Sequence, residues 1–311
     1  MTIVWTVLGI ALIALVVHDV FTVLFRPGAK SWFSSALARW VWTLLRRAGP
    51  QRRNILSLAG PLAMVTVVLF WAISLVVGYA LIYMPHYPQD YVLLEGTVAH
   101  SPFVGALHAS LTTVTTLGST NVAAKPAWLQ VVGPTEALIG FGMLTAAVTW
   151  LLQIYPVLSS RRALAYEIHL LADTERRLEL HAPQLETSVA SQIYAELTSR
   201  LIAVERDLVK FPITYYFAET DPRFALTAAM PVLSELAQRG RSAEHPDSVR
   251  LRAEMLNEAI EEFSATVLER FVVHRRHDGG DAIEAFAHDH GHAGDGSALR
   301  EQPADESRSL S

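Results

Sequence analysis

The sequence predicts an all-α membrane protein: three transmembrane helices, one helix too short to span a bilayer, and a helical C-terminal domain. Of the 311 residues, 51% are hydrophobic and only 18% are charged, which indicates a membrane protein with a soluble portion. The apolar runs 3–25, 55–84 and 128–155 are each long enough to cross a hydrocarbon core of about 30 Å at about 1.5 Å per helical residue. The first run has no basic start and no small-residue cleavage site after it, so we expect a transmembrane helix rather than a signal peptide.

The charges between the apolar runs predict the orientation in the membrane. The stretch 26–54 carries seven Lys and Arg and no acidic residue, whereas 85–101 carries Asp90 and Glu95 and no Lys or Arg. Cytoplasmic loops are enriched in Lys and Arg. We therefore expect a protein of the cell inner (plasma) membrane, with the N-terminus outside and the C-terminus in the cytoplasm. Residues 31–45 place three Trp beside basic residues and are predicted to lie along the inner membrane surface.

The remainder of the chain is predicted to be a helical cytoplasmic domain followed by a disordered tail. Helices are expected at 158–182, 187–210, 222–239 and 247–273, separated by Pro and Gly residues. The last has an apolar stripe that faces either a core or an oligomer partner, made of Leu251, Met255, Phe263, Val267 and Phe271. The tail has eight acidic residues against three Arg, with Gly, Ser and His between them. The expected domains are 1–54, 55–157, 158–275 and the tail 276–311.

Several function classes find no support in the sequence. The chain has no Cys, which excludes disulfides and thiolate metal sites. It has no glycine-rich phosphate loop and no nucleophile–base pair at useful spacing, so we expect neither an enzyme nor an organic cofactor. The tail carries about the whole net charge of −5, so the folded part is roughly neutral and no nucleic-acid partner is expected. A cytoplasmic regulator is expected, but its chemistry is not encoded in any motif.

The most informative segment lies between the second and third apolar runs. Ser101 and Pro102 form a helix start, and the predicted helix 102–114 has about 13 residues, too few to span, so it must be re-entrant. Residues 113–121 follow as Thr-Val-Thr-Thr-Leu-Gly-Ser-Thr-Asn. The negative end of the helix dipole, the backbone carbonyls and the Thr116 hydroxyl could together hold a partly dehydrated cation. The alternative is a Thr-rich turn whose hydroxyls only satisfy buried backbone groups.

Two motifs in this region resemble the two-helix pore module of the bacterial potassium-channel superfamily. The first runs from Ala106-Leu107 to Gly118 and corresponds to a pore helix and selectivity filter; the second is Phe141-Gly142-Met143-Leu144-Thr145-Ala146-Ala147-Val148 in the third apolar run. The resemblance covers 55–155, and the extra first helix with Asp19-Val20-Phe21 is similar to a three-helix branch of the superfamily. It implies a homotetramer in the lipid bilayer, with potassium as the permeant ion.

The resemblance also assigns roles to individual residues. It implies filter positions at Thr116, Leu117, Gly118, Ser119 and Thr120. It implies pore-helix support from Thr112, Thr113 and Thr115, and a gating hinge at Gly140 and Gly142.

This filter departs from the potassium-channel pattern in its outer half. Ser119 replaces the family's Tyr, and Thr120 replaces a Gly that adopts a positive φ. His108 and Ala109 occupy pore-helix positions where the family has an aromatic cuff. We therefore expect a wider outer filter that passes sodium as well as potassium. Two other interpretations stay open: a potassium-transporter-like protein, and a non-conducting membrane sensor or scaffold that keeps the pore fold.

Other polar residues are weaker candidates. His18 and Asp19 in the first run are ionisable at membrane depth and are either functional or a polar pair near the cytoplasmic interface. Glu136 in the third run is either functional or hydrogen-bonded behind the filter. A metal site at His288, His290 and His292, with His274 and His277 upstream, is a further hypothesis. Three His residues on the outer side could sense pH or simply pack, namely His86, His100 and His108.

Overall fold

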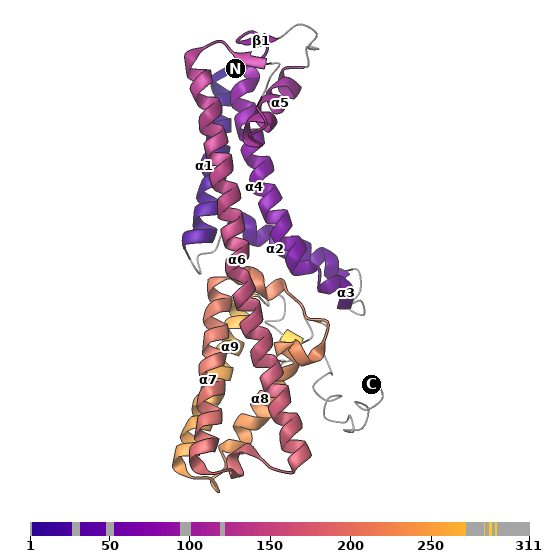
Figure 1. The fold of residues 1–311 in the computed structure, drawn as a ribbon, viewed down its shortest axis with the longest axis vertical. Helices are drawn as coiled ribbons and strands as arrows, with labels where there is room; N and C mark the ends of the chain where they lie inside the picture. Colours follow the sequence, from indigo (N-terminus) through magenta and orange to yellow (C-terminus); the bar gives the residue numbers. More distant parts are fainter. Residues whose placement is uncertain are drawn as a thin grey trace. The chain divides into compact units, whose positions relative to one another are not determined.

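The computed structural model describes residues 2–26, 32–47, 53–93, 101–118 and 122–271, together with 283, 286, 287 and 290. The chain divides into two compact units (Figure 1). The membrane unit comprises Met1–Arg39 and Ala63–Gln153, and the bundle unit comprises Trp40–Leu62 and Ile154–Ser311.

Three helices in the described part of the chain are long and apolar enough to cross a membrane. They are α1 (Thr2–Phe25), α4 (Ala59–Tyr83), which continues through the 3-10 turn η1 (Met84–His86), and α6 (Ala127–Leu178). The three predicted spanning segments are thereby confirmed as helices. The predicted surface segment forms α2 (Trp32–Arg47), followed by the short α3 (Arg53–Leu56), and the predicted short helix is α5 (Pro102–Val114).

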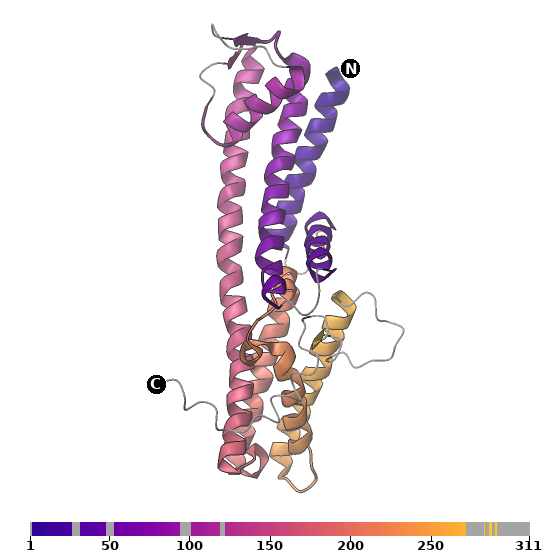
Figure 2. The ribbon, with the colours of Figure 1, turned by 90° about the vertical axis from the view of Figure 1, so that its right-hand side faces the viewer.

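Helices α1 and α4 run side by side in the membrane unit and approach closely through two glycines (Figure 2). A Cβ atom on Gly9 would collide with the carbonyl oxygen of Gly78, and one on Gly78 would lie 2.7 Å from the Ile13 side chain. Small residues at helix contacts let backbones approach within a bilayer, where packing rather than the hydrophobic effect drives association. This crossing fixes the extra N-terminal helix against α4.

A two-stranded antiparallel sheet closes the segment that contains α5. Strand β1 (Tyr91–Leu93) pairs with β2 (Val122–Ala124), with Tyr91 opposite Ala124 and Leu93 opposite Val122. The all-α prediction is therefore incomplete at this point. Strands of three residues are too short to show an alternating pattern, and only the pairing across the α5 segment defines them.

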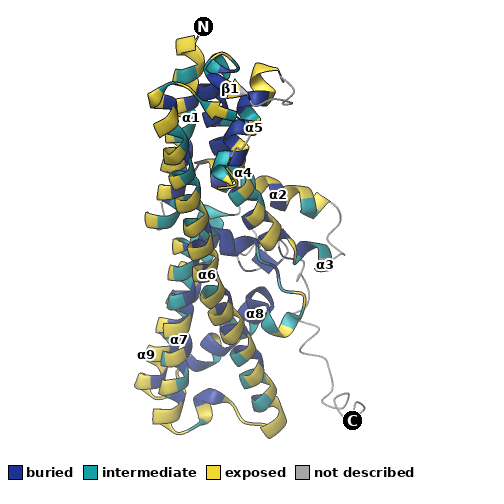
Figure 3. Cartoon of the chain, turned by 45° about the horizontal axis from the view of Figure 1, so that its top comes forward, coloured by how far each residue is buried: buried dark blue, intermediate teal, exposed yellow. Residues whose placement is uncertain are grey.

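The bundle unit contains the C-terminal part of α6 with α7 (Thr187–Lys210), α8 (Leu226–Gly240) and α9 (Asp247–Arg270). Three 3-10 turns connect them: η2 (Ala182–Gln184), η3 (Pro212–Tyr216) and η4 (Pro222–Phe224). Figure 3 shows buried residues along α8 and exposed residues along much of α6. The predicted stripe on α9 is divided: Phe263 and Val267 are buried, whereas Leu251 is 63% exposed.

Two of the predicted helix boundaries are wrong. A separate helix at 158–182 was expected, but α6 continues through Pro156 without a break. The helix predicted at 222–239 is divided into η4 and α8, and α8 carries Pro231 in its interior. A proline removes one backbone hydrogen bond, and a helix persists through it when its flanks are packed.

The predicted disordered tail is wrong at three positions. Phe286, Ala287 and His290 are 5%, 7% and 4% exposed and belong to the bundle unit. Their packing makes this part of 276–311 a structural element.

Candidate functional site

Helix α5 packs closely against the segment that follows α4. Ser101 occupies the N-cap position, but its side chain makes no capping hydrogen bond, so Pro102 at the first helical position is the feature of the predicted start that operates here. A Cβ atom on Gly105 would overlap the ring of Tyr87. Only glycine allows this approach, and it sets the depth at which α5 lies.

A buried carboxylate on α6 holds α5 against its neighbouring helices. Glu136 on α6 is 0% exposed. Ser110 of α5 donates to its Oε1 at 2.5 Å, and Tyr83 of α4 donates to its Oε2 at 2.6 Å. The Ser110 hydroxyl also lies 3.0 Å from the carbonyl oxygen of Val76 on α4. Glu136 therefore joins three helices through hydrogen bonds, and the prediction that it is hydrogen-bonded is confirmed.

The chain after α5 turns back through two residues with positive φ. The amide of Thr116 donates to the Thr113 carbonyl at 2.9 Å, and the amide of Gly118 donates to the Thr112 carbonyl at 3.1 Å. Gly118 has φ of 74°, which glycine adopts freely, but Thr116 has φ of 56°. For a β-branched residue this conformation costs about 1–2 kcal/mol. Backbone strain of this kind concentrates at functional sites, where surrounding structure holds it in place.

This turn is the candidate functional site. Thr115, Thr116, Leu117 and Gly118 are all exposed, and Leu117 is 77% exposed. The predicted filter residues Ser119 and Thr120 lie outside the described residues. The positive φ of Thr116 was not anticipated from the sequence, and the expectation for position 120 stays a prediction.

The predicted support residues make local hydrogen bonds to α5. The Thr113 hydroxyl donates to the Ala109 carbonyl at 2.8 Å, and the Thr115 hydroxyl donates to the Leu111 carbonyl at 2.7 Å. Thr112 is hydrogen-bonded in the same way to the carbonyls of His108 and Ala109. These hydroxyls satisfy backbone groups at the end of α5, as the alternative interpretation of the Thr-rich segment also requires.

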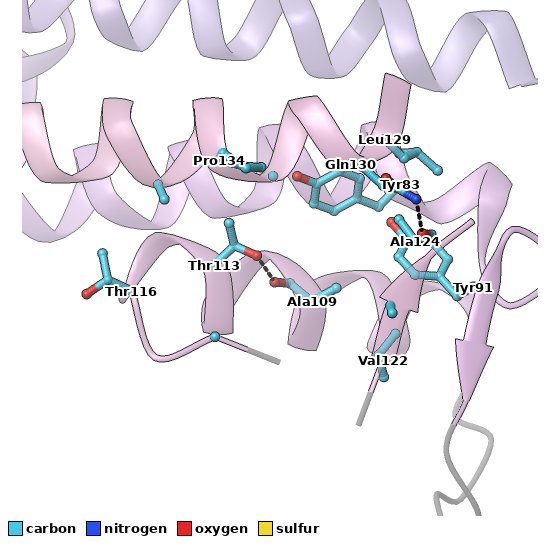
Figure 4. A pocket seen from close by; sticks show the side chains of 14 residues that line it. Tyr83, Tyr91, Ala109, Thr113, Thr116, Val122, Ala124, Leu129, Gln130 and Pro134 are labelled. Carbon is cyan, nitrogen blue, oxygen red and sulfur yellow. Dashed lines mark hydrogen bonds between the residues drawn. The ribbon is translucent and has the colours of Figure 1, made fainter. Parts of the chain in front are cut away.

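A groove of about 580 Å³ lies beside the turn (Figure 4). Thr113 and Thr116 line one side, and α6 contributes small residues such as Gly133, Pro134 and Ala137 on the other. Figure 4 shows the Thr113 and Thr116 side chains on the side of the groove opposite Pro134.

The predicted hinge glycines have different surroundings. A Cβ atom on Gly140 would lie 3.2 Å from the Val114 carbonyl oxygen, so this glycine lets α6 pass the end of α5. Gly142 faces open space. Helix α6 is continuous through both, and their role as a hinge stays a prediction. Apolar side chains next to them are exposed, at Phe141, Leu144, Val148, Leu152 and Tyr155.

A second buried carboxylate lies in the first helix. Asp19 is 4% exposed and accepts hydrogen bonds from Ser34 of α2 at 2.5 Å and from the Trp71 indole of α4 at 2.9 Å. His18 is exposed. Asp19 ties α2 to both neighbouring helices of the membrane unit.

Among the described residues, the histidines that the sequence analysis singled out do not gather into one site. His86 lies 2.7 Å from the Asp90 carboxylate, His108 is exposed, and His100 lies outside the described residues. His288 and His292, two of the three predicted metal ligands, also lie outside them. Both ring nitrogens of His290 face carbonyl oxygens, those of Tyr215 and Phe286. The described residues contain no group of three or more His, Asp or Glu placed to hold a metal.

Comparison with known proteins gives one coarse result. No family model matches the chain, and no solved structure matches it. The chain is similar to the uncharacterized membrane protein YdjJ of Bacillus subtilis (strain 168), at 22% identity over 224 residues. The match covers 69% of this chain and 63% of the Bacillus protein, so it spans less than two thirds of that relative. Together with the three long apolar helices, this similarity identifies the chain as a membrane protein.

Proposed function

We propose that the chain is one subunit of a homotetrameric cation channel that conducts potassium and sodium. The observation that carries the proposal is the exposed turn after α5, with Thr116 in a strained backbone conformation between two helices long enough to span a membrane. The proposal places this protein in the potassium-channel superfamily, with a re-entrant α5 and an altered outer filter.

The physical argument begins with the direction of α5. The C-terminal end of a 13-residue helix such as α5 carries a partial negative charge from the helix dipole, which attracts a cation. The turn from Thr115 to Gly118 then leaves helical geometry and is exposed in a single chain. Backbone carbonyls from several such turns could replace the hydration shell of a cation.

Assembly of several copies is part of the proposal, and the resemblance to potassium channels makes the expected number four. One copy supplies one pore turn, so a closed ring of copies is needed to surround an ion. Native mass measurement in detergent should give four times the 34.3 kDa chain mass. A stable monomer or dimer would contradict the proposal.

The location of the rest of the molecule belongs to the same proposal. The seven basic residues of 26–54 support a proposed orientation in which α2 lies on the cytoplasmic side of the inner membrane, with the N-terminus outside and the bundle unit inside. The bundle unit is then the part of the chain that a cytoplasmic regulator would reach.

The direct test is cation flux through purified protein in liposomes, with a matched pair of glycine variants. Gly118→Val puts a β-branched residue at φ of 74° in the turn and should abolish flux. In the matched variant Gly133→Ala the added methyl group meets no atom of the chain within 4 Å, so the protein should keep its stability and its assembly. If the unmodified protein forms tetramers but passes no cation, the non-conducting sensor or scaffold is the better description.

A further inference from the structure

We propose that three residues of the C-terminal tail, Phe286, Ala287 and His290, act as a strap that fastens the second half of α2 to the helical bundle. These three are called the strap residues below. The proposal concerns the bundle unit alone and stands whether or not the protein conducts ions.

The strap residues meet α2 at Trp42. The Trp42 side chain is 5% exposed, and its ring centroid lies 5.2 Å from that of His290. The same indole lies 5.7 Å from the ring of Tyr216 and 6.2 Å from that of Tyr215, both in η3. Trp42 is therefore enclosed by η3 and by a strap residue almost 250 positions later in the sequence.

The indole is held only by packing. Its Nε1 atom is buried and has no hydrogen-bond partner in the described part of the structure. A buried N–H without a partner opposes burial, so the aromatic contacts must supply the stabilisation. Loss of one of these aromatic contacts should therefore weaken the attachment of α2 to the bundle.

His290 and Phe286 make the contacts expected of a strap. The Nε2 atom of His290 lies 2.8 Å from the Tyr215 carbonyl oxygen, a hydrogen bond across 75 residues. The ring of Phe286 lies 5.9 Å from the rings of Tyr215 and Phe263, the latter on α9. The strap thus binds η3 and α9 at the same time as it covers Trp42.

The η3 segment, on which the strap residues pack, is held by contacts that do not involve the tail. Arg161 of α6 donates to the carbonyls of Thr214 at 2.8 Å and Phe217 at 2.6 Å, and Glu219 lies 3.6 Å from the same guanidinium group. Arg161 therefore holds the η3 backbone through contacts that do not involve the strap residues. Loss of the strap should free α2 without unfolding η3.

The strap matters because it holds the second half of α2 within the bundle unit. Trp42 belongs to that unit, and the strap residues form part of its surroundings. A bound regulator that displaces the strap would free one end of α2.

Thiol accessibility tests the strap, because the chain has no Cys and one introduced thiol is therefore unique. The reporter is Val41→Cys, at a side chain that is 7% exposed and adjacent to Trp42. Its reaction rate with a charged, membrane-impermeant maleimide is measured in the purified full-length chain and in two truncations. One ends after residue 282 and lacks the strap residues; the other ends after residue 290 and keeps them.

Loss of the strap should raise the rate at least tenfold, and the truncation after residue 290 should react like the full chain. Phe286→Ala and His290→Ala should give intermediate rates. A reporter at the exposed position Ser242→Cys should react equally in all of them. Equal protection of the Val41→Cys thiol in both truncations would overturn the proposal. If that reporter fails to fold, hydrogen–deuterium exchange of α2 in the two Cys-free truncations gives the same comparison, and unchanged exchange would likewise overturn it.

Discussion

Helix α5 has a packed side, here called the back, and an exposed turn at its end, here called the front; the two differ in how many contacts they make within one chain. On the back, Ser110 reaches Glu136, which has no exposed surface, and Gly105 lies against the Tyr87 ring. At the front, the chain leaves the helix through an exposed turn in which Thr116 has a positive φ and Leu117 is 77% exposed. The back face has its partners in the same subunit, whereas the front face exposes polar backbone and an apolar side chain.

This difference separates residues that support the site from residues that form it. A buried carboxylate with two short hydrogen bonds orders α5 in an isolated chain. The exposed turn is held by two backbone hydrogen bonds to α5, and we propose that the strained conformation of Thr116 serves the binding of an ion in the assembly. Substitutions on the back should therefore change stability, and substitutions at the front should change conduction.

The largest effect is expected for Glu136→Ala. The change leaves the hydroxyls of Ser110 and Tyr83 buried without their acceptor and opens a cavity, at a cost of about 2–4 kcal/mol. Thermal unfolding in detergent should show a clearly lower midpoint. Glu136→Gln keeps one carbonyl acceptor and should fall between the two; equal midpoints for all three proteins would show that the network does not hold α5.

A smaller loss is expected for Gly105→Ala. The added methyl group overlaps the Tyr87 ring, so α5 or the ring must shift, at a cost of about 1–3 kcal/mol. Gly133→Ala is the matched control, since its methyl group meets no neighbour within 4 Å. If both variants unfold at the same temperature, the close approach of α5 to Tyr87 does not position the helix.

At the front, Thr116→Gly should separate stability from function. Glycine adopts φ of 56° without strain, so stability should rise by up to about 1 kcal/mol. The same change removes the hydroxyl that we propose faces the ion, so conductance should fall or blocker sensitivity should change. Thr116→Ser keeps the hydroxyl and should retain most of the current. A Thr116→Gly channel with unaltered conduction would remove this residue from the site.

The smallest effect on stability, close to zero, is expected for Ser119→Tyr combined with Thr120→Gly. Both positions lie outside the described residues, so this prediction rests on the resemblance to potassium channels. The double change restores the family's outer filter residues and should shift ion preference toward potassium. The measurement is the potassium-to-sodium permeability ratio before and after the change. An unchanged ratio would show that these two positions do not determine ion selectivity.

Local signals in the sequence predicted the elements that they encode directly. Proline at position 102 gave the first residue of α5, and the Thr-rich turn gave its end. The bounds of α7 were also predicted correctly, between Pro183 and Pro212. Composition and hydropathy were sufficient for the three long apolar helices.

Contacts between distant segments could not be predicted in this way. Glu136 was recognised as a buried acid, but its partner Tyr83 is 53 residues away, and no local pattern links them. The β1–β2 pair and the strap residues depend on the same kind of pairing across the chain. The continuous α6 shows the converse error, because a local breaker at Pro156 was outweighed by the helix around it.

Reversal-potential measurement under bi-ionic conditions tests the central claim most directly. Purified, unmodified protein in a planar bilayer would have potassium on one side and an equal concentration of sodium on the other. We expect a measurable cation current and a reversal potential that favours potassium only modestly, because the lower filter residues are present and the outer ones are replaced. A strongly potassium-selective reversal potential would contradict the account of the outer filter, and the absence of any current from assembled tetramers would contradict the channel itself.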